Sequence, residues 1–289
     1  MARLYDDVMA HKRLDKLQRD YLRKCTIISA DNVARYLEDS GHAWAGSMFT
    51  LPNIAPPLKD MFIEFKMPAP LHAIGWYFQA FDVRDGDLPA TGINATEYEG
   101  ARWMLRGFEY LGNDTSQPHM WAQIFVNPDG TMLRTKHDVF MLPTRGGMFE
   151  YWLTNPEEAP ENAFAPHLFF LTIALWTITF MHTKNVIQEE VPPIVKLSKK
   201  HEARYGEPLV TYRVIKIKPM GGKRVAGEDQ GGSHRAISAH IRRGHFKTYT
   251  EDKPLLGRAT GTFWWEQTLA GSEKQGKVTH GYEIGEVTA

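Results

Sequence analysis

The sequence from Asn162 to Met181 reads NAFAPHLFFLTIALWTITFM and contains no Asp, Glu, Lys or Arg. In a helix that rises about 1.5 Å per residue, this segment would be long enough to cross a bilayer. One histidine and three threonines lower its hydropathy, however, and Pro166 is typical of a first helical turn, which would shorten the apolar helix. A helix that is apolar on every side also belongs at the centre of a large domain. We therefore expect a buried central helix over about 162–182 and no membrane association.

The composition of the chain is that of a globular protein. It has 289 residues, of which 43% are hydrophobic and 12% aromatic, enough apolar material to offset the entropy of ordering the chain. This length corresponds to one large domain or two ordinary ones. The 34 basic and 34 acidic residues give a formal net charge of +0, which excludes a basic coat over the whole molecule but allows a local basic patch. The single cysteine, Cys25, excludes a disulfide framework and any site that needs several cysteines.

The first 24 residues mix charged and apolar side chains and contain no continuous apolar stretch. They therefore do not have the pattern of a secretory signal, and we expect a cytoplasmic protein.

Strands are expected to form most of the middle of the chain. Apolar residues at helical spacing predict helix through residues 4–38, and Pro56-Pro57 marks residues 41–58 as a connecting loop. After this loop, β-rich runs separated by turn residues predict a series of strands. They cover 61–65, 72–81, 101–110, 118–127, 131–142 and 148–154. The clearest turn, Asn127-Pro128-Asp129-Gly130, joins two of these strands as a hairpin.

Beyond the central helix we expect a short strand over 186–191, a charged helix over 194–205 and an alternating, half-buried strand over 209–217. Residues 221–233 contain five glycines and predict a flexible loop. Further short strands are expected over 236–242, 245–249 and 260–265.

This order of elements favours an α+β fold with mostly antiparallel pairing, because no alternating βαβ pattern is evident and a Rossmann-type domain is therefore not expected. Three regions follow: a helical N-terminal segment over 1–58, a mixed core over 59–191 and a β-rich C-terminal region over 192–289, which together can form a single domain.

Several motifs of nucleotide-binding and hydrolytic enzymes are absent: the sequence contains no GxxxxGK[ST], GxGxxG, HExxH or GxSxG. A basic and aromatic cluster near the C-terminus remains as the candidate site. Residues 218–258 hold nine Lys or Arg against four Asp or Glu, which is typical of a face presented to an anionic partner. Aromatic residues beside Arg and His also suit stacking on unpaired bases.

The predicted strand 245–249 places His245, Lys247 and Tyr249 on one face, because side chains alternate along a strand. A one-residue bulge at Gly244 would bring His240 to the same face. A histidine moves protons near neutral pH, a lysine stabilises phosphorane charge, and RNA supplies its own 2′-hydroxyl nucleophile. The set therefore favours phosphodiester cleavage without a metal or other cofactor. The catalytic candidates are His245, Lys247, His240 and Tyr249, and the substrate-binding candidates are Arg242, Arg243, Arg258 and Trp264.

A metal site is the alternative chemistry for these histidines. His182, His240 and His245 would have to converge with a carboxylate such as Glu266 or Glu283 to hold zinc. An equally simple explanation for His182 is that it ends the central helix, where an imidazolium is favoured by the helix dipole. We therefore expect no metal.

The blocks MHTKNV (181–186), PLVTYRVIKIKPM (208–220), HIRRGHFKTYT (240–250) and LLGRATGTFWW (255–265) resemble a protein family of bacteriophages, prophages and their bacterial hosts. The similarity covers residues 170–270, with a looser match at 56–65. A second histidine follows the tryptophans in the family pattern, but residues 266–271 contain none here. The family has no activity that could be transferred, so the resemblance implies an origin in a mobile element and the cytoplasm of a host cell.

Two classes of function stay open. The first is a nucleic-acid-directed, ribonuclease-like enzyme with RNA as the favoured substrate. The second is a non-enzymatic factor that uses the same face to bind and modulate a host or defence protein. A structural role in the virion is a third, weaker possibility.

Overall fold

The structure is a computed structural model of the chain. It describes residues 3–12, 14, 16–39, 47–67, 73–86, 88, 98–113, 115, 118–134, 139–144, 161–217, 238–242, 244–265, 268–270 and 272–277. The chain divides into two compact units, Met1–Ile217 and Lys218–Ala289. Each unit is described by itself. The division differs from the three expected regions, because residues 192–217 belong to the first unit.

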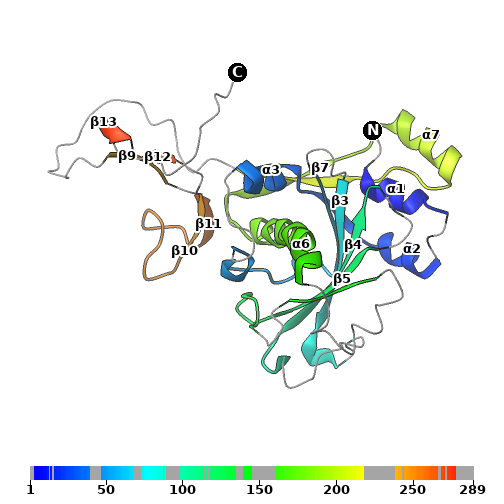
Figure 1. The fold of residues 1–289 in the computed structure, drawn as a ribbon, viewed down its shortest axis with the longest axis horizontal. Coiled ribbons are helices and arrows are strands. Elements are labelled where there is room, and N and C mark those ends of the chain that lie inside the picture. The colour runs from blue at the N-terminus through cyan, green and yellow to red at the C-terminus, as the bar shows by residue number, and fades with distance from the viewer. Residues whose placement is uncertain are drawn as a thin grey trace. The chain divides into compact units, whose positions relative to one another are not determined.

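An eight-stranded sheet forms the first unit, in the order β6-β5-β4-β3-β2-β1-β8-β7 (Figure 1). The pair β1/β2 and the pair β1/β8 are parallel and every other pair is antiparallel. The fold is therefore α+β with a mostly antiparallel sheet, as expected. The strands are β1 (Thr26–Ser29), β2 (Asp60–Lys66), β3 (Ala73–Asp82), β4 (Trp103–Leu111), β5 (Met120–Val126), β6 (Phe140–Pro143), β7 (Val186–Val191) and β8 (Tyr212–Ile217).

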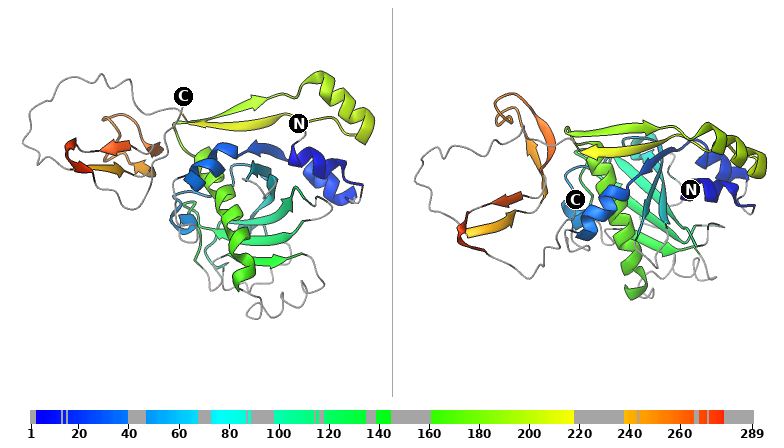
Figure 2. Two further views of the ribbon diagram at one scale, coloured as in Figure 1. Left: turned by 45° about the horizontal axis from the view of Figure 1, so that its top comes forward. Right: turned by 90° about the horizontal axis from the view of Figure 1, so that it is seen from above.

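Helices cover both faces of this sheet. On one face lie α6 (Glu161–Met181) and α3 (Asp31–Asp39), and on the other lie α1 (Leu4–Ala10) and α2 (Lys16–Leu22), as the views in Figure 2 show. Strand β2 contacts both layers: Phe65 packs against Phe170 of α6, whereas Phe62 packs against Tyr5 of α1. Phe62 and Phe65 are three residues apart in one strand, so their side chains point to opposite faces.

The central helix is confirmed as a buried element. Its side chains from Phe169 to Phe180 are all buried, because a helix that is apolar on every side needs cover all around. The helix begins at Glu161 rather than near Pro166, which lies inside it. Within the described ranges, no helix is long and apolar enough to cross a membrane.

The expectation of continuous helix through residues 4–38 was wrong. Strand β1 interrupts the helices at Thr26–Ser29. The chain then runs through α3 into β2, which pairs with β1 in parallel. This is a βαβ connection, contrary to the expectation that the fold contains none. The consecutive apolar pair Ile27-Ile28 is buried on both faces, as is typical of a parallel strand in the middle of a sheet.

The predicted turn at 127–130 is confirmed. The amide of Gly130 donates to the carbonyl of Asn127 over 2.9 Å, and an isolated bridge joins Val126 to Met132. Gly130 has φ +89°, and a Cβ there would lie 2.2 Å from Oδ1 of Asn53. Only glycine fits this position without displacing Asn53.

Most of the remaining predictions for the first unit are confirmed. The strand expected over 131–142 is an exception, because residues 131–134 form only the bridge at Met132 and β6 covers Phe140–Pro143. Strand β7, the helix α7 (Val195–Tyr205) and strand β8 fall where they were expected, and α7 ends at Gly206 with φ +79°. The described part of this unit also contains the 3-10 turns Met48–Thr50 and Val83–Asp85. The expected strand 148–154 and the glycine-rich loop 221–233 lie outside the described residues.

The second unit is formed from short strands, and the three predicted ones are present as β9 (Ser238–Arg242), β10 (His245–Tyr249) and β11 (Gly261–Trp265). Strands β10 and β11 pair as an antiparallel hairpin. Strand β9 pairs with β12 (Thr268–Ala270) and β13 (Ser272–Lys277).

Candidate functional site

The hairpin β10/β11 carries the predicted catalytic residues. His245 and Lys247 are exposed and Tyr249 is half-buried. The three occupy alternate positions of β10 and therefore share a face. The Lys247 ammonium lies 4.9 Å from the centroid of the Tyr249 ring, which packs edge-on against Phe263 at 5.8 Å. This face thus presents an imidazole and a cation supported by an aromatic ring.

The residues expected to bind substrate differ in their exposure to solvent. Arg258 is exposed in the turn 255–259. Trp264 is only 1% exposed, and its ring lies 4.7 Å from that of Phe246. Stacking on a base would need an exposed ring, so Trp264 instead belongs to the packing of the hairpin. His240 and Arg242 lie on β9, and Arg243 lies outside the described residues.

Strands β9 and β10 belong to different sheets, since β9 pairs with β12 and β13 whereas β10 pairs with β11. Arg243 and residues 266–267 lie outside the described residues. The bulge at Gly244 that would bring His240 to the face of His245 therefore stays a prediction.

The metal alternative gains no support from His182. Its Nε2 lies 2.7 Å from the carbonyl oxygen of Ala55 and is hydrogen-bonded to it, which ties the end of α6 to the loop before β2. No group of three or more His, Cys, Asp or Glu residues could hold a metal ion in the part of the chain that the structure describes.

A cavity of about 650 Å³ opens in the first unit, where the start of α1 meets the end of β2 and the segment 186–217. We call this segment, which contains β7, α7 and β8, the arm. Apolar residues of the arm and acidic residues of the other elements line the cavity. Its charged residues are Arg3, Asp6, Asp7, Asp31, Glu64 and Lys66, and Tyr212 also lines it.

Glu64 is the central charge of this cavity. It is 4% exposed; the Arg3 guanidinium donates to its Oε1, and the amide of Tyr5 donates to its Oε2 over 3.0 Å. Burial raises the pKa of Glu64, and Arg3 opposes this rise.

The Arg3 guanidinium also lies 3.2 Å from the centroid of the Tyr212 ring, so it joins α1, β2 and β8. Burial likewise raises the pKa of Asp6 and of Asp7.

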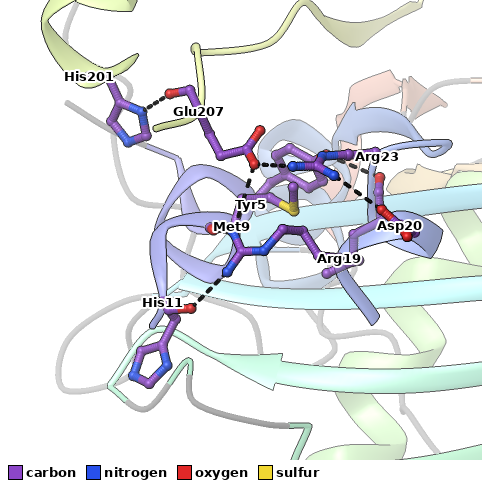
Figure 3. A network of polar contacts seen from close by, with 9 residues as sticks. Tyr5, Met9, His11, Arg19, Asp20, Arg23, His201 and Glu207 are labelled. Carbon is purple, nitrogen blue, oxygen red and sulfur yellow. Dashed lines mark hydrogen bonds and ion pairs between the residues drawn. The ribbon is translucent and has the colours of Figure 1, made fainter. Parts of the chain in front are cut away.

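Polar contacts fix the arm beside α1 and α2, as Figure 3 shows. The carboxylate of Glu207, at the end of α7, accepts from the guanidinium of Arg23 and lies 3.9 Å from that of Arg19. His201 Nδ1 lies 2.7 Å from the carbonyl oxygen of Glu207. Because α7 itself has no buried residue, the contacts of Glu207 with Arg23 and Arg19 help to hold it in place.

A buried carboxylate–imidazole pair lies on the other face of the sheet. Glu109 of β4 is fully buried, and its Oε2 lies 2.6 Å from Nδ1 of His167 in α6. Burial raises the pKa of Glu109, and His167 opposes this rise. Neither these two residues nor Glu64 were expected from the sequence to form a site. The available signal was a lone charge within an apolar strand, as in MFIEF (61–65) and GFEYL (107–111).

No protein-family model, no curated protein and no solved structure matches this chain. The candidate sites therefore rest on their own geometry.

Proposed function

We propose that the protein binds single-stranded nucleic acid, with RNA favoured, through the face of β10 that carries His245, Lys247 and Tyr249. The observation that supports this most directly is the exposed Lys247 ammonium held 4.9 Å from the Tyr249 ring on an open hairpin. A cation beside an aromatic ring on an exposed strand can contact a phosphate while a base stacks nearby.

Cleavage is the second part of the proposal. His245 lies two residues before Lys247 on the same face, so an imidazole that removes a proton from the 2′-hydroxyl would have a cation beside it for the developing phosphorane charge. An open hairpin favours binding over catalysis, because catalytic groups are usually held in a cleft that excludes water.

Binding can be tested with a fluorescent single-stranded RNA at several salt concentrations. We expect Lys247→Gln to weaken binding about three- to tenfold and to reduce the salt slope by about one counterion, since one phosphate contact is lost. Lys199→Gln, which changes an exposed lysine of α7, is the matched control and should bind like the wild type. Equal affinities of wild type and Lys247→Gln at every salt concentration would contradict the proposal.

Cleavage requires a separate assay. Wild-type protein and His245→Ala are incubated with RNA and with DNA of the same sequence, in the presence of EDTA. The proposal predicts that only RNA is cut, because DNA lacks the 2′-hydroxyl, and that His245→Ala does not cut it. If RNA stays intact although it binds, the protein is a binder and the enzymatic part is wrong.

The arm favours a second candidate function, the docking of a host protein. Ile194, Val195, Leu197 and Tyr205 are between 44% and 68% exposed, and Ile194 and Leu197 line the cavity. This is more apolar exposure than a short helix usually shows. The acidic lining suits a partner segment that combines basic and apolar side chains. A Lys/Leu peptide should therefore bind more tightly than a Glu/Leu peptide of the same length, and Leu197→Ser should weaken that binding.

A further inference from the structure

Two polar side chains lie on the face of the sheet that packs against α1 and α2. One lacks hydrogen-bond partners and the other lacks a counter-ion. Arg106 of β4 and Gln123 of β5 are directly opposite each other in the antiparallel pair, so their side chains are neighbours on one face. Gln123 is 1% exposed, and neither its amide nitrogen nor its amide oxygen has a hydrogen-bond partner. The Nε of Arg106 is also buried without a partner.

The charge of Arg106 has no counter-ion among the described residues. Its guanidinium lies 5.1 Å from the centroid of the Phe108 ring and 5.8 Å from that of Trp121, and the ionisable groups that act on it are the phenols of Tyr21 and Tyr77. Burial lowers the pKa of Arg106. Among the described residues, Arg213 of β8 pairs with Glu190 over 3.2 Å, and Arg102, just before β4, pairs with Asp82 over 2.6 Å.

Such an arrangement costs stability. A buried amide without hydrogen bonds and a shielded guanidinium without a counter-ion each destabilise the folded chain, because water is lost and nothing replaces it. Native proteins hydrogen-bond most buried polar groups, so a cluster of exceptions calls for an explanation, and a bound ligand is one. Three groups are open here: the Arg106 Nε–H and the Gln123 Nε2–H as donors, and the Gln123 Oε1 as an acceptor.

We propose that Arg106 and Gln123 form a binding site for a phosphate group, either free phosphate or a phosphate monoester. A carboxylate or a phosphodiester would accept from the two donors but could not donate to Gln123 Oε1. A phosphate group near neutral pH carries both oxyanions and, in its monoprotonated form, a hydroxyl. It therefore satisfies all three open groups. Arg106 is half-buried, and Tyr21 of α2, whose phenol acts on it, is 39% exposed. The three open groups are themselves covered, so binding requires the side chains over them to move, and we expect the ligand to enter from the side of α2.

The test uses the full chain, with inorganic phosphate, adenosine 5′-monophosphate and sulfate as ligands, and follows the melting temperature and the heat of binding. Phosphate should raise the melting temperature in a saturable way. Sulfate should bind on the order of tenfold more weakly, because it has the same shape but no proton to donate at neutral pH. Tighter binding of the nucleotide than of free phosphate would identify a monoester as the ligand, and the reverse would identify the free ion.

Two variants separate binding from folding. Gln123→Leu should melt at a higher temperature than the wild type without ligand, since it removes an unpaired buried amide, and should lose the phosphate response. Gln123→Glu should behave in the same way, because its carboxylate takes the place of the ligand beside Arg106. Arg84→Met, at an exposed arginine paired with Asp82, is the matched control and should keep the response.

The proposal is overturned if phosphate and sulfate raise the melting temperature of all four proteins alike. That result would show that both salts stabilise the fold in a general way, because they are excluded from the protein surface, and that there is no specific binding site. It is also overturned if both Gln123 variants melt lower than the wild type and keep the phosphate response.

Discussion

At the scale of single residues, Glu109 links burial to the pH dependence of stability. Its carboxyl is fully buried against His167, and burial raises its pKa above the ordinary value of 4.5. The folded chain therefore holds this proton more tightly than the unfolded chain does. The free energy of unfolding must then fall as the pH rises from about 4.5 through the raised pKa, because the folded state has to ionise a buried group.

This reasoning predicts the behaviour of Glu109→Gln, in which the carboxamide can still accept from His167. In urea denaturation between about pH 4 and 7, the wild type should lose more stability with rising pH than the variant does. Glu99→Gln, in an exposed turn, should follow the wild type. Parallel curves for wild type and Glu109→Gln would mean that burial does not raise the pKa of this carboxyl.

At the scale of elements, local patterns predicted those strands and helices whose signal lies within a few residues. Strand β8 alternates apolar and polar residues, and α7 ends at a glycine, so both were placed correctly from the sequence. Strand β1 was missed because its four residues lie between helices and are stabilised by their neighbours β2 and β8 rather than by their own propensity.

The same limit applies to the candidate sites. His245, Lys247 and Tyr249 were placed on one face because a strand has a period of two. Glu109 and His167 are 58 residues apart, and Arg106 meets Gln123 only through strand pairing. No local pattern could bring these residues together, and none could show that Trp264 is buried.

The arm provides a prediction at this scale. Glu207→Ala removes the carboxylate that the guanidinium of Arg23 contacts and that lies near Arg19. Since α7 has no buried residue, we expect trypsin to cut the arm several times faster in this variant. Global stability should change by only about 0–1 kcal/mol, as is usual for ion pairs near the surface. Asp20→Ala, which leaves the contact between Arg23 and Glu207 in place, is the control. Unchanged cleavage of Glu207→Ala would show that other contacts hold the arm.

At the scale of the whole molecule, the division of the chain at residue 217 has a consequence for folding. All eight strands of the large sheet and the helices on both of its faces belong to the first unit. A domain that contains its own core can fold alone. A fragment of residues 1–217 should therefore unfold in urea with one cooperative transition, and its midpoint should match that of the first unit in the full chain.

A second fragment makes this test specific. Residues 1–191 end after β7 and lack α7 and β8, although β8 lies between β1 and β7 in the sheet. Without β8, strand β1 loses one of its two parallel neighbours, and the ring of Tyr212 no longer lies against Arg3. We expect this fragment to unfold at a clearly lower urea concentration or not to fold at all. If it matched residues 1–217 in stability, the arm would be an appendage, and the cavity that it lines could close or open without any cost to the fold.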